Sequence, residues 1–282
     1  MTTSAPSTPQ QAKQDYDKAA PAYSNYASTP SGQLEGELIE LALRDCCIPG
    51  STTVLDLGGG NGLYARKALQ LGAVLVDVVD ISPGMLEAGR NIDGSDDGTY
   101  TPDMENRLRF FEADATKSLN HLPLLLLLQD KYDVVMANWI FSFVGTSQEL
   151  EGVFGNVKRY LKPGGRFIGV RDADPWSPVL RTGKYGGLCR DVRRVPGGVE
   201  YVCELQCNTP AAPVVFKGRC LETIYSGSAA AYEEFGGLTD VEIVPYGSAP
   251  VVQGDPDFWD EFLKRPCLAV VKALRVVAAT EL

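Results

Sequence analysis

Glycines are concentrated in one short stretch of the chain, directly after an apolar run. The run 53–57 reads Thr-Val-Leu-Asp-Leu, and glycines follow at positions 58, 60 and 62 before an amphipathic segment over 63–71. Glycine lets a backbone adopt positive φ and come close to a ligand. A helix that begins just afterwards offers unpaired N–H groups to a negative group. The spacing therefore predicts a nucleotide-type binding turn between a buried strand and a helix.

Two common nucleotide motifs do not fit this turn. The dinucleotide fingerprint G-x-G-x-x-G/A needs a small residue at its sixth position, and counting from Gly58 that position is the bulky Leu63. A phosphate-binding P-loop needs Gly-Lys-Ser/Thr, which occurs nowhere in the chain. A nicotinamide oxidoreductase is therefore disfavoured, and a flexible strand–helix turn without a ligand remains the alternative.

An acidic residue ends the next predicted strand, which covers 74–80. The two carboxylate oxygens of Asp80 suit the two vicinal hydroxyls of a ribose, because each oxygen can accept one O–H. The alternative role for Asp80 is to cap the helix that follows. That role is disfavoured because Ser82 already serves as N-cap, with Pro83 in the first turn.

The G-x-G-x-G spacing led by Asp56 resembles motif I of the class I S-adenosylmethionine-dependent methyltransferases. Further segments resemble that family in its order and approximate spacing: Ile81–Leu86, Glu112–Ala115, Tyr132–Trp139 and Leu161–Phe167. The resemblance covers about 15–276, and the chain departs most from the common pattern over 172–226.

This resemblance implies an α/β fold, a Rossmann-like seven-stranded methyltransferase sheet whose last hairpin is antiparallel. The ligand would bind at the carboxyl ends of the strands. The cofactor implied is S-adenosylmethionine, with S-adenosylhomocysteine as product. Asp80 would hold the ribose, Asp114 the adenine, and the loop 58–62 the methionine part. The full set of implied cofactor residues is Tyr16, Tyr23, Asp56, Gly58, Gly60, Gly62, Asp80, Ile81, Met85, Asp114, Ala115 and Asn138.

The N-terminal pattern Tyr16-Asp17-x-x-Ala20-x-x-Tyr23 resembles the first helix of small-molecule methyltransferases related to the ubiquinone and menaquinone biosynthesis enzymes. In that reading, Tyr16 or Tyr23 reaches the methionine carboxylate, and 15–50 form a helical lid over the cofactor. The alternative is that both tyrosines pack on the core. Residues 1–14, rich in Ser, Thr, Pro and Gln, are predicted to be a disordered tail.

The remaining chain, 51–282, is predicted to be one methyltransferase domain with an antiparallel β insertion over 172–226 that recognises the acceptor. Aromatic residues just after the fourth strand suggest an apolar acceptor pocket, although core packing would explain them equally well. Arg171 would bind an anionic or carbonyl group of the acceptor, or pair with a neighbouring aspartate. The predicted substrate-binding residues are Trp139, Phe143, Arg171, Trp176 and Tyr185.

No catalytic residue can be identified from the sequence. The signature Asn/Asp-Pro-Pro-Tyr/Phe of many base and glutamine methylases is absent, because Asn138 is followed by Trp-Ile-Phe. The single histidine, His121, is predicted to lie on the surface. Asp172, Asp174 and Tyr185 remain candidate bases without support from a motif.

Apolar runs alternate with helical patterns between 53 and 170, as in βαβ units. The predicted strands are 53–57, 74–80, 108–112, 132–138, 166–171, 199–205, 214–225, 241–244 and 268–276. The predicted helices are 63–71, 83–90, 149–161, 228–235 and 257–263, and the leucine run 122–128 is interpreted as a buried helix. A long polar loop is predicted over 93–106.

Composition limits the partners of the chain. The formal net charge of its 282 residues is −10, which disfavours binding to nucleic acid or to an anionic membrane. The seven cysteines form no CxxC pair and no glycosylation acceptor site occurs, so we expect a reducing, cytoplasmic location without structural metal. The longest aliphatic run is too short to cross a membrane. The oligomeric state stays open.

These observations favour a methyltransferase that acts on a small aromatic or heterocyclic metabolite, of the kind found in secondary metabolism. The first alternative is a cofactor-binding cyclase or pericyclase of the same fold that transfers no methyl group. A non-catalytic cofactor-binding subunit is a further alternative. Product mass separates the first two, because only methylation adds a methyl group.

Overall fold

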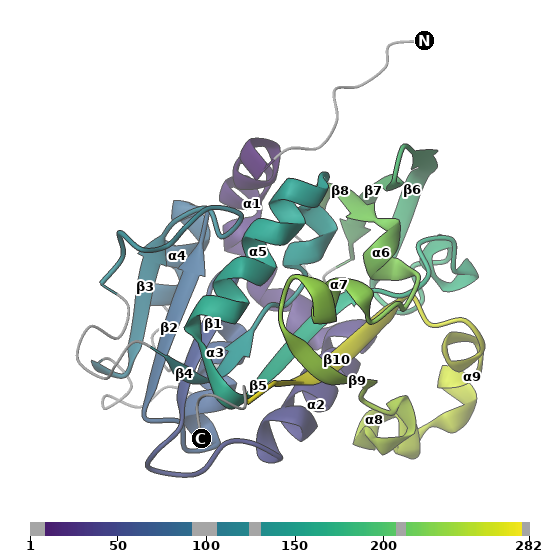
Figure 1. Cartoon of the computed structure of the whole chain (residues 1–282). Coiled ribbons are helices and arrows are strands. Elements are labelled where there is room, and N and C mark those ends of the chain that lie inside the picture. The colour runs from purple at the N-terminus through teal and green to yellow at the C-terminus, as the bar shows by residue number, and fades with distance from the viewer. Residues whose placement is uncertain (1–8, 92–105, 124–130, 207–212, 278–282) are drawn as a thin grey trace.

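The computed structural model describes residues 9–91, 106–123, 131–206 and 213–277. A seven-stranded sheet with the order β3-β2-β1-β4-β5-β10-β9 forms its centre (Figure 1). The first five strands in this order are parallel, and β10 runs antiparallel to both β5 and β9. The predicted Rossmann-like sheet with an antiparallel final hairpin is confirmed. The strands are β1 (Thr53–Leu57), β2 (Leu75–Asp80), β3 (Leu108–Glu112), β4 (Tyr132–Met136), β5 (Leu161–Asp172), β9 (Leu238–Ile243) and β10 (Leu268–Arg275).

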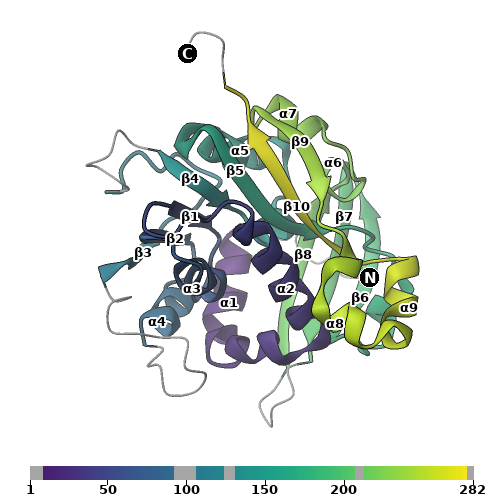
Figure 2. The same ribbon diagram turned by 90° about the horizontal axis from the view of Figure 1, so that it is seen from below.

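Helices cover both faces of this sheet. Figure 2 shows α5 and α7 on one side of the strands and α2 and α3 on the other. Every residue of β1 is therefore buried: Leu55 packs in the core beneath α5, and Val54 packs in the core beneath α2 and α3. The helices that follow α1 in the chain, apart from the short α6, are α2 (Pro30–Arg44), α3 (Leu63–Gln70), α4 (Pro83–Arg90), α5 (Ser147–Tyr160), α7 (Ala230–Glu234), α8 (Pro250–Gly254) and α9 (Pro256–Lys264).

The N-terminal segment begins with α1 (Pro9–Tyr23), followed by the 3₁₀ helix η1 (Ser24–Ser28) and then α2. The prediction of a disordered tail over 1–14 is therefore wrong for 9–14, while 1–8 lie outside the described residues. Two contacts stabilise the helix over 9–14. Ala12 is buried, and Lys13 forms an ion pair with Glu112 at 2.6 Å. Thr29 caps α2 by accepting a hydrogen bond from the Gly32 N–H at 3.1 Å.

The segment after β5 contains the predicted antiparallel insertion. Strands β6 (Gly187–Val195), β7 (Gly198–Leu205) and β8 (Val214–Leu221) form a separate sheet in the order β6-β7-β8. Alternate side chains of β7, including Tyr201 and Cys203, are buried in the core. The short helix α6 (Glu222–Tyr225) occupies the end of what the sequence predicts as one long strand. The small sheet packs through β8 against α1 and against the 3₁₀ turn Ile140–Phe143 that follows β4.

Two predictions concern segments that are largely outside the described residues. They are the polar loop over 93–106 and the helix over the leucine run, of which 124–128 are not described. Among the described residues, no helix combines the length and the apolar character that crossing a membrane requires.

Candidate active site

A cavity with about 940 Å³ of free space opens at the carboxyl ends of the central strands. We call it the first cavity. It is lined by the glycine loop, by the ends of β2 and β4, by residues 113–116 after β3, and by the N-terminal helices. Of the residues predicted to bind cofactor, it contains Tyr16, Tyr23, Gly58, Gly60, Asp80, Ile81, Met85, Asp114, Ala115 and Asn138. Asp56 and Gly62 do not line it.

The glycine loop has the backbone conformation that its composition predicts. Gly58, Gly60 and Gly62 have φ of 69°, 55° and 75°, in the left-handed region that glycine adopts without a steric penalty. A Cβ at Gly60 would lie 2.9 Å from Met85 Cε. Gly62 precedes α3 and provides no side-chain cap, so the first N–H groups of that helix remain available to a ligand.

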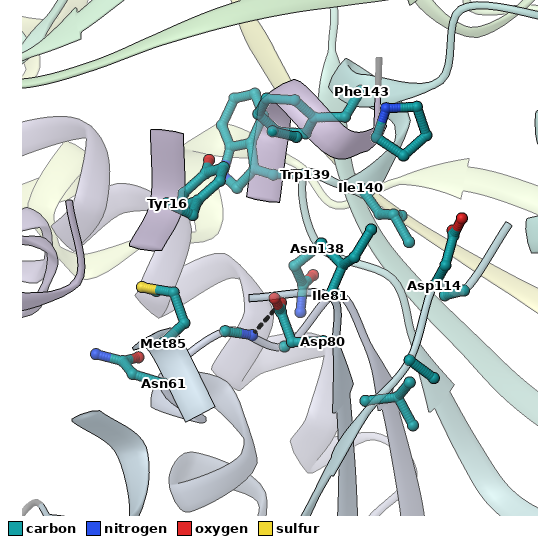
Figure 3. Close-up of a pocket in the computed structure, with 18 of the residues that line it drawn as sticks. Tyr16, Asn61, Asp80, Ile81, Met85, Asp114, Asn138, Trp139, Ile140 and Phe143 are labelled. Atoms are coloured by element: carbon teal, nitrogen blue, oxygen red, sulfur yellow. Dashed lines mark hydrogen bonds between the residues drawn. The ribbon is translucent and has the colours of Figure 1, made fainter. Parts of the chain in front are cut away.

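Asp80 projects from the end of β2 into the first cavity, beside the glycine loop (Figure 3). One of its carboxylate oxygens accepts the Gly60 N–H and the other accepts the Ser82 N–H, both at 2.8 Å. Each oxygen keeps a lone pair that a ribose hydroxyl can use. Burial raises the pKa of Asp80 to about 6, against the lowering effect of the backbone hydrogen bonds. Ser82 caps α4 through Met85 N–H at 3.1 Å, as the sequence predicts.

Two buried polar side chains at this end of the sheet have no hydrogen-bond partner among the described residues. They are Asp56, with both carboxylate oxygens, and Asn138, with its amide oxygen and nitrogen. Asp56 lies beneath the glycine loop, where a Cβ at Gly59 would approach its carboxylate to 2.6 Å. Burial and the charge of Asp80 raise the pKa of Asp56 to about 7. Asn138 lines the cavity, so its amide is free to hydrogen-bond to a bound ligand.

Asp114 lies on the opposite side of Asp80 from Met85 in the view of Figure 3. Its Oδ1 accepts the backbone N–H and the hydroxyl of Thr116, at 2.9 and 2.7 Å. The carboxylate therefore stabilises its own turn and also lines the cavity, and its contact with adenine stays a prediction.

The N-terminal helices form one wall of the first cavity. Asp17 Oδ1 accepts the Ser82 hydroxyl at 2.6 Å and the Gly84 N–H at 3.0 Å, and so fastens α1 to the start of α4. The ring of Tyr16 stacks on Phe216 and meets Phe143 edge-on, with centroids 5.8 and 5.4 Å apart. Tyr16 therefore packs against other rings and also lines the cavity, and its contact with the methionine carboxylate stays a prediction.

Sequence reasoning missed the buried carboxylate of Glu35 on α2. It accepts hydrogen bonds from the hydroxyls of Tyr26 and Tyr64, at 2.7 and 2.5 Å, and from the Trp139 indole N–H at 2.7 Å. Burial raises the pKa of Glu35 to about 7, although all three donors lower it. Its three partners line the first cavity. The sequence signal for this group is weak: Glu35 lies at helical spacing from the apolar residues Leu38 and Ile39.

The residues around this cavity fit an adenosine-containing cofactor with a positively charged amino-acid part. They provide a carboxylate for vicinal hydroxyls, a glycine loop that permits close approach, and buried acidic and amide groups that lack partners. A protein family described as "Methyltransferase domain" matches residues 54–165, which include most of these groups. The chain carries an S-adenosylmethionine-dependent methyltransferase domain over these residues.

Curated relatives match this methyltransferase domain over part of their length. The chain is 32% identical over 130 residues to a demethylmenaquinone methyltransferase of Clavibacter sepedonicus, covering 46% of this chain and 45% of that protein. It is 28% identical over 117 residues to phosphoethanolamine N-methyltransferase 1 of Triticum aestivum, covering 41% of this chain and 20% of that protein. The chain thus spans less than half of the length of these relatives.

Solved structures resemble nearly the whole chain. The [4+2]-cyclase SpnF has a TM-score of 0.56 at 17% identity, covering 97% of this chain and 98% of that one. An S-adenosylmethionine-dependent methyltransferase from Mesorhizobium loti has a TM-score of 0.51 at 23% identity, covering 86% and 100%. At these identities the likeness establishes the fold.

A second cavity, with about 630 Å³ of free space, adjoins the first in the methyltransferase fold. It lies between the N-terminal helices, the end of β5 and the small antiparallel sheet. The residues that line both cavities are Tyr16, Tyr23, Tyr26, Trp139 and Phe143. The remaining walls of the second cavity are Ser31, Ser142, Asp172, Leu180, Gly187, Cys189, Tyr201, Cys203, Leu205, Phe216, Cys267 and Leu268.

Three predicted acceptor residues lie outside both cavities, which corrects their expected placement. Arg171 is buried and donates to the carbonyl oxygen of Asp172 at 2.7 Å, so its guanidinium is used inside the fold. Trp176 meets Tyr225 edge-on, with centroids 5.5 Å apart. Tyr185 packs on the α9 aromatics and donates its hydroxyl to the Phe258 carbonyl at 2.8 Å.

The candidate bases are also separated by the structure. Asp174 forms an ion pair with Arg265, with a nitrogen–oxygen distance of 2.5 Å. It lines neither cavity. His121 is exposed in a turn. Of the candidates named from the sequence, Asp172 alone lines a cavity. Trp139 and Phe143 line both cavities, while their neighbour Phe141 is fully buried in the core.

Proposed function

We propose that this protein transfers a methyl group from S-adenosylmethionine to a small aromatic or heterocyclic acceptor bound in the second cavity. The observation that carries the proposal is the shared wall of the two cavities. A cofactor held by the glycine loop, Asp80 and Asp114 would place its reactive end toward Trp139 and Phe143. An acceptor in the second cavity would then meet it across that wall.

The cofactor supplies an activated methyl group when bound, so the protein's task is to align the acceptor and exclude water. The aromatic side chains between the cavities suit this task because they are large, rigid and apolar. The N-terminal helices cover the same region, and we propose that they act as a lid. The similarity to a demethylmenaquinone methyltransferase supports a relation to small-molecule methyltransferases of that type.

Isothermal titration calorimetry with S-adenosylmethionine, S-adenosylhomocysteine and NADH, run in parallel, tests the cofactor. We expect both sulfur nucleotides to bind and NADH to give no heat of binding. Binding of NADH, or failure of both sulfur nucleotides, would contradict the proposal.

The fold alone does not choose between methyl transfer and ring formation, because the [4+2]-cyclase SpnF shares it. A mass-resolved screen of small aromatic and heterocyclic acceptors with S-adenosylmethionine separates the two. A product heavier by one methyl group, together with S-adenosylhomocysteine, supports transfer. A product of unchanged mass, made without consuming the cofactor, would favour the cyclase.

A further inference from the structure

One carboxylate faces the second cavity from the carboxyl end of β5. The side chain of Asp172 is held by two hydroxyls from different elements. The Ser142 hydroxyl donates to Oδ2 at 2.7 Å, and the Tyr201 hydroxyl lies 3.0 Å from Oδ1 and 3.1 Å from Oδ2. Asp172 is only 6% exposed. These contacts aim a preorganised acceptor of protons and hydrogen bonds at whatever occupies the cavity.

The other walls of this cavity carry no opposite charge. They are aromatic, aliphatic, hydroxyl or thiol side chains, and no described Lys, Arg or His lines the cavity. Burial raises the pKa of the Cys267 thiol, and a hydrogen bond with Cys189 together with burial raises the pKa of Cys203, so both thiols are neutral. The guanidinium of Arg171 is the adjacent cation, and it is directed to a backbone carbonyl.

A single carboxylate in a cavity of this kind disfavours anionic ligands and favours an organic cation. The rings that surround the cavity add to this preference, because aromatic faces attract ammonium groups. Tyr16, Tyr23, Trp139, Phe143 and Phe216 supply such rings.

We propose that the acceptor is a small primary or secondary amine on an apolar or aromatic body, and that Asp172 binds its ammonium group and removes one proton. This inference rests on the proposed methyltransferase function and names the substrate class of the same site. The proton moves from nitrogen to a carboxylate oxygen of Asp172. The freed lone pair of nitrogen then forms the new N–C bond to the methyl carbon. The C–S bond of the sulfonium donor breaks with its electron pair on sulfur, and the protonated carboxyl later returns its proton to solvent.

Burial decides between an amine and a phenol as the acceptor. Transfer into an apolar cavity raises the pKa of a carboxyl group and lowers the pKa of an ammonium group, because an apolar environment disfavours the charged form of each group. The two pKa values approach each other, so proton transfer from ammonium to Asp172 is assisted. For a phenol, burial raises both pKa values, and the same assistance is missing.

Equilibrium binding tests the inference without relying on turnover. The protein is saturated with S-adenosylhomocysteine and titrated with a series of arylalkylamines of increasing linker length. Phenols and arylalkyl carboxylates of matching shape form the comparison series. We expect one or more amines to bind, the carboxylates to fail, and Asp172→Asn to weaken amine binding by at least about tenfold.

The matched control is Asp174→Asn, which changes a carboxylate two positions along that is paired with Arg265 and lies outside the cavity. It should leave amine affinity unchanged. Failure of the whole amine series, tighter binding of phenols or carboxylates, or equal effects of the two variants would overturn the inference. If S-adenosylhomocysteine itself fails to bind, the proposed function is refuted instead.

Tyr201→Phe provides a second test that retains the ring in the core. Removal of its hydroxyl takes away a hydrogen bond that lowers the pKa of Asp172. Burial raises the pKa of Asp172, while hydrogen bonds from the Ser142 and Tyr201 hydroxyls and the Cys220 thiol, and the charge of Arg171, lower it. The thiols of Cys203 and Cys267 also interact with this carboxyl. Because the variant loses one of the contacts that lower the pKa of Asp172, the acidic midpoint of amine binding, below which the carboxyl is protonated, should move to higher pH. A midpoint that stays in place or moves downward would contradict the assignment.

Discussion

The substitution Asp80→Asn tests the cofactor assignment most directly, because it keeps the shape of the side chain and removes its charge. The two carboxylate oxygens of Asp80 accept the Gly60 and Ser82 N–H groups, both at 2.8 Å. In the proposed complex the same oxygens also accept two ribose hydroxyls. A hydrogen bond to a charged group contributes about 1.5–3 kcal/mol, and asparagine keeps one of the two acceptor oxygens. We therefore expect a loss of about 2–4 kcal/mol, or about 30- to 1,000-fold in Kd.

Isothermal titration with S-adenosylhomocysteine measures this loss, and Asp133→Asn is its matched control. Asp133 accepts the Thr53 N–H at 2.8 Å and pairs with Lys162 at 2.6 Å, near the amino ends of the strands. Its replacement should lower the melting temperature without changing nucleotide affinity. If Asp80→Asn binds within about threefold of the original protein, or if both variants lose affinity equally, the ribose assignment is refuted.

Three further substitutions test the groups that surround the first cavity. Burial raises the pKa of Asp56 to about 7, so its protonated form stabilises the fold at low pH. That contribution, on the order of 4 kcal/mol, should disappear as pH rises from about 4 to about 7, and Asp56→Asn should flatten this part of the urea unfolding profile. Glu35→Ala leaves three buried donors unpaired and should lower the free energy of unfolding by about 3–5 kcal/mol. Glu40→Ala, on the same helix but partly exposed, should lower it by less than about 1 kcal/mol. Asp17→Ala removes the acceptor of two hydrogen bonds from α4 and should weaken S-adenosylhomocysteine binding by about 5- to 30-fold in calorimetry. Lys13→Ala, which breaks an ion pair of the same helix, should have little effect.

The first cavity could be predicted from the sequence because its signals are local. The glycine loop, Asp80 and the capping Ser82 each follow directly from the order of residues around a strand end. Parallel strands then bring those ends together at one edge of the sheet. A pattern over about ten residues is enough to predict such a site. The fold class follows from the alternation of apolar runs with helical patterns.

The second cavity could not be predicted in the same way, because its residues come from segments far apart in the chain. Arg171 and Asp172 are adjacent on β5, and alternation along the strand sends their side chains in opposite directions. The sequence does not state which of the two faces the acceptor, and the prediction favoured Arg171. Tyr185 is predicted to bind the acceptor, but it packs on the aromatic residues of α9, outside both cavities.

Trp139 connects the groups that sequence reasoning found with those that it missed. Its φ is 63°, a left-handed conformation that bulky residues rarely adopt and that costs about 1–3 kcal/mol. Two hydrogen bonds hold it there. The backbone N–H donates to the Val170 carbonyl at 2.9 Å, and the indole N–H donates to Glu35 at 2.7 Å.

The conformation of Trp139 thus depends on a carboxylate that belongs to the predicted lid. Since the indole lines both cavities, any movement of α2 that withdraws Glu35 also changes the wall between cofactor and acceptor. In the proposed complex the N-terminal segment would cover the cofactor and would also, through Glu35, hold the Trp139 indole between cofactor and acceptor. A change at Glu35 should therefore alter acceptor binding even where cofactor affinity is retained.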